Sequence, residues 1–417
     1  MTFLLEILLQ TLRDIWAHKL RSFLTMFGIS WGIASIIFMI AIGDGFKIGY
    51  RNFMYEMGTD IVILWGGRTT LQAGGQRAGR WIRFNFDDIR AIQQDCYLVK
   101  HVTPELARDE PLRSQYNAGQ FSVHGVAPVY QQIRTMTPAR GRPIDDADFD
   151  QAREVCVLGD QVKRQLFAER QAVGAQIFIG DIPFTVVGVL DKKEQNSSYN
   201  GLDGDKVLIP YTTMARHFPD PSTFTGPGHI DNIIFNPVTA NDHESALKQV
   251  KASLGRRHDF KPEDRGALWA WDTVEQVRLV STIYDSMQVF LTFVAITTLA
   301  LGGVGVMNIM LVSVAERTRE IGVKRAVGAK RRRILTEFFL EAIVLTLLSG
   351  LAGVVVALMV CSAVNRMSLP ALFSGLPVTP VTAGAAFVTL VLVGILSAIY
   401  PARRAAWLEP VEALRHE

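Results

Sequence analysis

The sequence predicts an integral membrane protein of the α-helical class, with four transmembrane helices and both the N and C termini in the cytoplasm. A large extracytoplasmic α+β domain is expected on helical stalks between the first and second spans. The first observation is four runs without a charged residue, each long enough to cross a hydrocarbon core that takes about 20 helical residues. These runs are residues 22–43, 286–315, 342–365 and 367–402.

The second observation is the distribution of Lys and Arg between the loops. Residues 313–335, between the second and third runs, carry eight basic residues, whereas residues 366–380 carry one. Because Lys and Arg accumulate in loops that stay in the cytoplasm, the first loop is placed inside and the second outside. The net charge of +3 is too small to indicate nucleic acid as a partner.

The N-terminal residues 1–21 have apolar side chains at helical spacing, among them Leu4, Ile7, Leu8 and Leu12. They predict a cytoplasmic amphipathic helix lying in the membrane interface. The first transmembrane helix is expected over residues 22–45. Its helical pattern continues through Phe46, Tyr50, Phe53 and Met57, which indicates a stalk leaving the membrane.

Residues 46–272 are expected to form the extracytoplasmic domain, because short strand and helix patterns alternate along them. Strands are expected at 60–64, 155–158, 176–179, 184–190 and 206–210, and two subdomains are expected. Asn85 is expected to cap a helix over residues 85–92. With 28 basic and 29 acidic residues in 46–282, the domain is nearly neutral.

Asp272 is expected to cap a second long helix, residues 273–314, which contains the rest of the stalk and the second span. At 1.5 Å per residue its length is about 60 Å, roughly twice what the bilayer requires. Within it, Gly302, Gly303 and Gly305 are expected to let membrane helices pack closely. The pattern therefore predicts a domain held on rigid helices.

Residues 315–335 are expected to form a short charged cytoplasmic helix between the second and third spans. Glu320 and Lys324 form an i,i+4 pair, and Gly328 is placed to end the helix. The alternative interpretation is a solvated loop that serves only as a topology signal. The third span is expected over 336–365, where Glu337 and Glu341 are expected to pair with Arg331–Arg333.

The chain is then expected to continue with an outer loop over 366–380, a fourth span over 381–402 and a cytoplasmic tail over 403–417. No catalytic site is predicted, because the eight histidines are scattered and no nucleophile lies beside a base in any recognisable motif. No metal site is predicted from the three cysteines. Cys96 and Cys156 both fall in the outer domain, where a disulfide between them is one alternative.

Three sequence stretches resemble the MacB/FtsX-type permease superfamily of ABC transporters. They are SVAERTREIGVKRAVGAKRRRIL at 313–335, GGVGVMNIM at 302–310, and YPARRAA with EPVEALR at 400–415. The outer domain is similar to the MacB periplasmic core, in the pieces MGTDI, GRPI, VLG, LF and FTVVGV. The resemblance covers nearly the whole chain and is closest to a stand-alone MacB-like permease.

The resemblance implies a permease that uses mechanotransmission: a cytoplasmic ATPase drives movement of the outer domain in an efflux or export system. It implies that the ATPase contacts the segment through Glu316, Arg317, Arg319, Glu320, Ile321, Gly322 and Gly328, with Ile321 docking in a groove. The chain has no GxxxxGK[ST] phosphate-binding loop, so ATP and Mg²⁺ are expected on a separate ATPase chain and no cofactor on this one.

The implied partners are that ATPase, a second permease copy (identical or paralogous), a periplasmic adaptor, an outer-membrane channel and membrane lipid. The implied location is the bacterial inner membrane, with the large domain in the periplasm. Two alternatives share the four-span layout: a lipoprotein-releasing permease of the Lol type, and an FtsX-type signalling permease that controls a cell-wall hydrolase.

Overall fold

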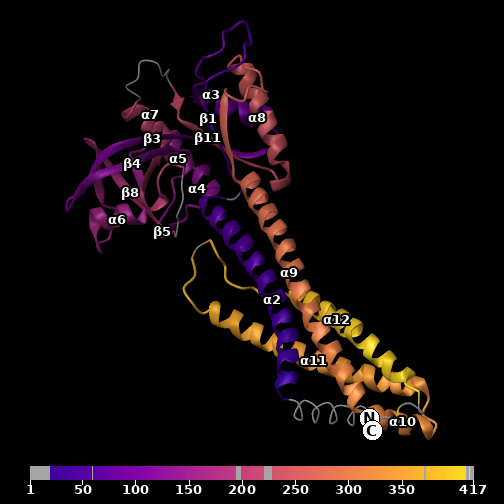
Figure 1. Ribbon diagram of the computed structural model, residues 1–417. Coiled ribbons are helices and arrows are strands. Elements are labelled where there is room, and N and C mark those ends of the chain that lie inside the picture. The colour runs from indigo at the N-terminus through magenta and orange to yellow at the C-terminus, as the bar shows by residue number, and fades with distance from the viewer. Residues whose placement is uncertain are drawn as a thin grey trace. The chain divides into compact units, whose positions relative to one another are not determined.

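The computed structural model describes residues 19–58, 60–193, 199–219, 228–370, 372–409 and 413. The chain forms two compact units (Figure 1). The helical unit comprises Met1–Gly49 and Val280–Glu417, and the sheet unit comprises Tyr50–Leu279. The amphipathic helix predicted over residues 1–21 lies, up to residue 18, outside the described residues.

The helical unit is built from long apolar helices. They are α2 (Lys19–Met57), α9 (Thr273–Glu316), α11 (Arg331–Val364) and α12 (Pro380–Trp407), with the short α10 (Thr318–Ala326) between α9 and α11. Within the described residues, the four long helices have the length and apolar composition needed to cross a membrane. This confirms the predicted four spans. Helix α9 contains 44 residues, close to the expected 42, and α2 continues to Met57 as predicted.

Small residues bring the membrane helices together. A Cβ atom on Gly302 of α9 would lie 3.0 Å from the backbone carbon of Gly28 on α2, and a Cβ on Gly353 of α11 would lie 2.4 Å from the Ser30 carbonyl oxygen. The Ser30 hydroxyl also donates a hydrogen bond of 2.6 Å to the Ser349 carbonyl oxygen. Helix α2 is therefore packed at backbone distance against both α9 and α11, as small residues allow in membranes.

The sheet unit contains one continuous sheet in the order β12-β1-β11-β3-β4-β9-β6-β8-β5, with β7 paired to β3 and β8. Among the strand pairs of the described residues, β4–β9 and β6–β8 are parallel and the others antiparallel. The strands are β1 (Val62–Gly66), β3 (Val99–Arg113), β4 (Ala118–Val126), β5 (Pro138–Gly141), β6 (Val155–Leu158), β7 (Gln176–Ile179), β8 (Ile182–Leu190), β9 (Lys206–Pro210), β11 (Asn232–Pro237) and β12 (Leu268–Asp272). A separate pair joins β2 (Phe84–Asn85) to β10 (His229–Ile230).

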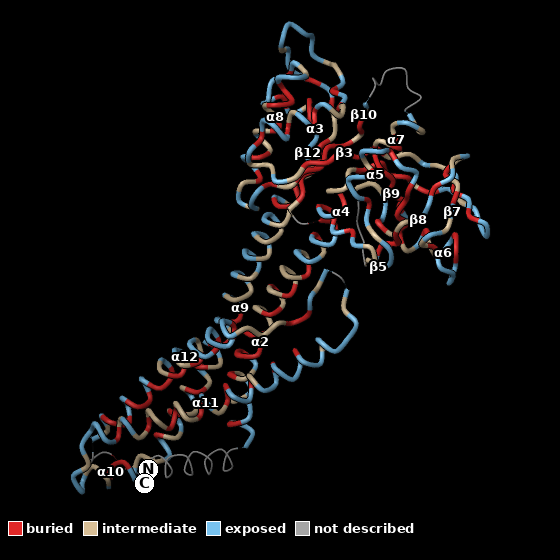
Figure 2. Tube along the Cα trace, turned by 180° about the vertical axis from the view of Figure 1, so that it is seen from behind, coloured by how far each residue is buried: buried red, intermediate tan, exposed pale blue. Residues whose placement is uncertain are grey.

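Strand β3 joins the two halves of this sheet. Its residue Glu105 is in register with Asn232 of β11 on one side and with Val126 of β4 on the other. The two expected subdomains therefore share one sheet, whose strands carry many buried residues (Figure 2).

Short helices cover the sheet: α3 (Phe86–Asp95), α4 (Val129–Ile133), α5 (Asp146–Asp150), α6 (Asp160–Phe167), α7 (Tyr211–His217) and α8 (His243–Arg257). Helices α3 and α8 lie side by side (Figures 1 and 2), and Arg257 and His258 at the end of α8 bond to the buried Asp88 on α3. The α3 cap is as predicted, because the Asn85 side chain accepts from the Asp88 N–H in a capping box.

Asp272 caps α9 as predicted. Its Oδ1 atom accepts hydrogen bonds from the N–H groups of Val274 (2.9 Å) and Glu275 (3.1 Å). Its other oxygen bonds to Nδ1 of the buried His243, at 2.5 Å. The first turn of α9 is thereby fixed to the sheet unit at a strand end, because Asp272 is also the last residue of β12.

Candidate functional site

The candidate site is the coupling segment, defined as residues 315–335, which contains α10 and the two turns around it. The helix is interrupted at Arg317, whose backbone leaves helical geometry at φ −101° and ψ 15°. It ends at Ala326, two residues before Gly328, which has a φ of +101°. Because a residue with a Cβ is strained at that φ, glycine is what permits the tight turn into α11.

The inner face of α10 is packed into the helical unit. Ile321 has 2% of its surface exposed and belongs to the same buried cluster as Val314, Ile334 and Phe338. Gly322 beside it is also buried. The expectation that Ile321 docks in a groove of another protein does not fit this conformation, because the side chain is already enclosed by its own chain.

Two ion pairs connect the coupling segment to α11. Lys324 Nζ lies 2.8 Å from Glu337 Oε1 and 2.9 Å from Glu320 Oε1, while Arg317 Nη1 lies 3.4 Å from Glu341 Oε2. The i,i+4 pair of Glu320 and Lys324 was predicted. The predicted pairing of the two acids of α11 with Arg331–Arg333 was wrong, since Glu337 pairs with Lys324 and Glu341 with Arg317.

The pKa of Lys324 shows that this contact favours the charged amine. Burial alone would lower this pKa, but the hydrogen bonds to Glu337 and Glu320 outweigh burial and raise it. Lys324 is therefore held in its charged form where it contacts the start of α11.

The end of α12 is attached to the same region. The Arg331 guanidinium carbon, at the start of α11, lies 4.6 Å from the centre of the Trp407 ring at the end of α12. This cation–π contact brings together the ends of α11 and α12 that adjoin the coupling segment.

The apolar residues Ile321, Val323 and Val327 predict one apolar side of this segment, but the structure separates them and leaves the two valines exposed. Val323 is 49% exposed and Val327 is 85% exposed. Glu316 and Arg319 are exposed as well. Val323 lies two positions, or about 200°, from Ile321 on a helix, so it lies on the side of α10 opposite Ile321, and Val327 follows directly after the helix.

The three predicted packing glycines differ in their surroundings. Gly302 lies against Gly28, and a Cβ on the buried Gly303 would lie 2.8 Å from Cγ1 of Val393 on α12. Gly305 is half-buried. The first two positions thus bring α9 close to α2 and α12.

Neither a metal centre nor a disulfide is formed by the described residues. No group of three or more His, Cys, Asp or Glu side chains is arranged there to hold a metal ion. Cys96, Cys156 and Cys361 are free and buried, which answers the open question about the Cys96–Cys156 pair for this conformation. Burial raises the pKa of the Cys96 thiol to about 11, so it is not an activated nucleophile.

Two protein-family models match this chain. Residues 22–253 match the MacB-like periplasmic core domain, and residues 292–410 match the FtsX-like permease C-terminal domain. The first match alone covers more than half of the chain.

Two curated relatives match over almost the whole chain. The macrolide export ATP-binding/permease protein MacB of Bdellovibrio bacteriovorus is 31% identical over 99% of this chain and 62% of its own length. The pyoverdine export ATP-binding/permease protein PvdT of Pseudomonas putida is 32% identical over 99% of this chain and 60% of its own length. The chain thus spans about three fifths of the length of the curated relatives it matches.

Among solved structures, the periplasmic region of MacB from Actinobacillus actinomycetemcomitans aligns with a TM-score of 0.43 at 18% identity, over 55% of this chain and 95% of that one. This likeness is too distant to add to the assignment, which rests on the two sequence families. The chain is a membrane protein with an extracytoplasmic domain, and it belongs to the MacB/FtsX-type ABC transporter permease family.

Proposed function

We propose that this chain is the permease subunit of an ABC-type export system of the bacterial inner membrane, in which the coupling segment receives the motion of a cytoplasmic ATPase. The observation that carries the proposal is the two-sided character of α10. One face is buried at Ile321, while the opposite face exposes Val323 and Val327 next to Arg319. Exposed apolar side chains beside charges are what a protein partner recognises.

The contacts of α10 supply a route for that motion. A push on α10 reaches α11 through the Lys324–Glu337 and Arg317–Glu341 pairs. It reaches the sheet unit through α9, a single helix from Thr273 to Glu316 whose first turn is capped by Asp272. We propose that ATP-driven movement of α10 is converted into movement of the extracytoplasmic domain, and that this movement performs the export.

ATP hydrolysis is proposed to take place on an ATPase outside these 417 residues, which contain no GxxxxGK[ST] motif. A second permease copy, a periplasmic adaptor and an outer-membrane channel complete the proposed assembly. The names of the relatives, which describe macrolide and pyoverdine export, support export as the general activity.

The proposal is tested by reversing charges on the exposed face of the coupling segment. Glu316→Lys combined with Arg319→Glu should reduce the ATPase that co-purifies with the chain by about tenfold or more, because misplaced charges at an interface cost several kcal/mol. The variant should still be inserted in the membrane, since both side chains are exposed.

The matched control is Arg366→Glu, an exposed arginine in the loop expected on the opposite side of the membrane. It should retain the ATPase at the wild-type level. Equal ATPase recovery from wild type and the Glu316→Lys/Arg319→Glu variant would contradict the proposed contact.

A further inference from the structure

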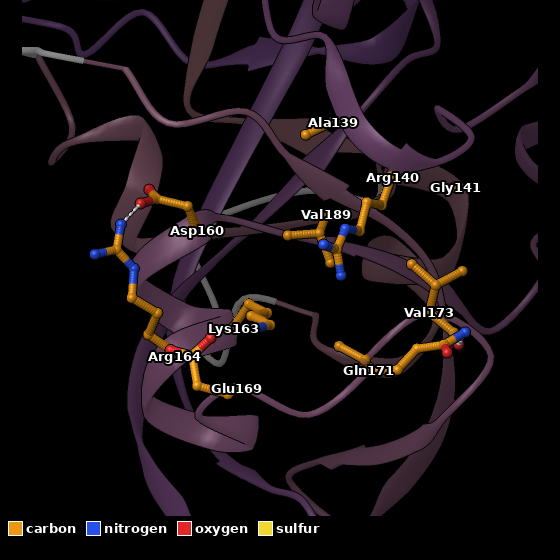
Figure 3. Close-up of a pocket in the computed structure, with 11 residues that line it drawn as sticks. Ala139, Arg140, Gly141, Asp160, Lys163, Arg164, Glu169, Gln171, Val173 and Val189 are labelled. Atoms are coloured by element: carbon orange, nitrogen blue, oxygen red, sulfur yellow. Dashed lines mark hydrogen bonds and ion pairs between the residues drawn. The ribbon is translucent and has the colours of Figure 1, made fainter.

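The sheet unit contains a hollow of about 650 Å³ next to the last strand of its sheet (Figure 3). Its walls come from β5, β8, α6 and the loop that follows α6. The volume falls in the range of about 300–1,000 Å³ typical of small-molecule sites. The coupling segment contributes nothing to it, so the function of this hollow is a separate question.

The backbone of β5 is shaped so that it forms one wall. The β5–β8 pairing shifts register between Pro138 and Arg140, and such bulges re-aim a side chain. Gly141 follows with a φ of +81°, and a Cβ there would lie 2.1 Å from the Val187 carbonyl oxygen. Figure 3 shows the Arg140 side chain extending from β5 into the space between the walls.

The charges on the walls do not balance. Arg164 forms an ion pair with Asp160 on α6. Lys163 Nζ donates to the Ala168 carbonyl oxygen at 2.6 Å, a partner that carries no charge. Within the described residues, Arg140 has no carboxylate partner, so Arg140 and Lys163 face a single remaining acid of the hollow, Glu169.

Apolar side chains supply the rest of the surface. Ala172 is buried, Val173 is half-buried, and Val189 of β8 is 9% exposed; all three line the hollow. A concave site with an apolar wall and a few converging charged groups is the usual form of a ligand pocket. An excess of positive charge beside that wall selects for a negatively charged ligand.

We propose that this hollow binds an organic carboxylate of small-molecule size. The carboxylate lies against Arg140 and Lys163, and the apolar body of the ligand lies on Ala172, Val173 and Val189. Arg140 can hold a carboxylate with two parallel N–H···O bonds, which makes it the main anchor. Glu169 disfavours ligands with more than one negative charge.

The site would give the extracytoplasmic domain a ligand of its own. It goes beyond the proposed function, because binding here requires neither the ATPase nor the coupling segment. If no ligand binds in the hollow, the proposed coupling to the ATPase is unaffected. If the ATPase does not contact the coupling segment, the proposed ligand site is likewise unaffected.

The test measures binding to the full chain in lipid nanodiscs, using fluorescence anisotropy of 2-naphthoate. The control ligand is 2-naphthamide, which has the same ring without the charge. We expect saturable binding of the acid and at least about tenfold weaker binding of the amide, the change expected for one charged hydrogen bond.

Three variants separate the site from general effects on folding. Arg140→Gln should weaken 2-naphthoate binding by about tenfold, while Glu169→Gln should tighten it, because a like charge is removed. Arg77→Gln changes an exposed arginine that does not line the hollow and should leave the affinity unchanged. Equal affinity for the acid and the amide, or equal affinities of the Arg140→Gln and Arg77→Gln variants, would overturn the proposal.

Discussion

Asp203 holds together a group of buried cations in the sheet unit. Its carboxylate lies 2.7 Å from Arg134 Nη2, 3.2 Å from Lys193 Nζ and 3.3 Å from Lys206 Nζ. Arg134 and Lys206 are completely buried. Burial alone would raise the pKa of Asp203, but the charges of Arg134, Lys206 and Lys193 outweigh burial and lower it.

Replacing Asp203 with Asn should destabilise the sheet unit by about 3–5 kcal/mol, because two buried cations lose their shared counter-charge. Unfolding can be followed with a thiol-reactive dye in a background in which Cys96 and Cys361 are replaced by Ala. Cys156 is then the reporter, since it is fully buried and burial raises its thiol pKa. The exposed Asp205→Asn is the control and should change stability by less than about 0.5 kcal/mol.

The same residue predicts how stability responds to acid. Because the folded pKa of Asp203 lies below its unfolded value of about 3.9, its contribution is complete above that value and is lost as pH falls through the folded pKa. Measured by tryptophan fluorescence, the stability difference between wild type and Asp203→Asn should be constant above about pH 5 and shrink below about pH 4. A difference that grows on acidification would contradict this role.

Residue-level predictions succeeded where the chemistry is local. The caps at Asn85 and Asp272 were predictable, because a cap needs only a short polar side chain and the next three residues. The partners of Glu337 and Glu341 were not predictable in the same way. They depend on how α10 folds back on α11, which brings Lys324 and Arg317 closer than the adjacent arginines.

At the scale of elements, the long helices were predicted well, but only some strands were: β4, β5, β11 and β12 were not predicted. Strands β6, β7 and β9 have the predicted bounds, whereas the 15-residue β3 was missed. Pro104 and Pro111 lie within β3, and proline argues against a central strand because it cannot donate to the ladder. The sheet therefore contains its longest strand where the local sequence discourages one.

The packing of α9 on α2 gives an element-scale prediction. Gly302→Val should lower the stability of the helical unit by about 1–3 kcal/mol, because the new side chain must displace the Gly28 backbone. Labelling of Cys361 during heating, in a background without Cys96 and Cys156, measures this, since Cys361 is buried in that unit.

Gly384→Val on α12 is the matched control, because a Cβ at Gly384 meets nothing within 4 Å. It should leave the unfolding temperature nearly unchanged. If the two variants unfolded at the same temperature, the close approach at Gly302 would not be a source of stability.

At the scale of the whole molecule, the sequence was sufficient for the membrane class and for locating the coupling segment. Uncharged runs and a biased charge distribution depend on composition and are visible without a structure. Which side chains of the segment face outward was not visible, because the exposed pair Val323 and Val327 and the buried Ile321 have the same chemistry. Only the phase of α10 against the other helices separates them.

The central claim is that ATP-driven motion passes from α10 to the extracytoplasmic domain, and the most direct measurement is a distance between two copies of that domain. The chain, with its native cysteines replaced by Ala and Tyr97→Cys spin-labelled at an 80% exposed position, would be purified with its ATPase. Its pulsed electron paramagnetic resonance spectrum would be recorded with and without ATP.

The account predicts that ATP changes the label-to-label distance in this protein. Adding Lys324→Ala and Glu337→Ala removes the 2.8 Å pair that fixes α10 to α11. Because a less firmly held α10 passes less motion on to α9, the change should be reduced while the ATPase still co-purifies. An ATP-dependent change of the same size in both proteins, or no change in either, would contradict the claim.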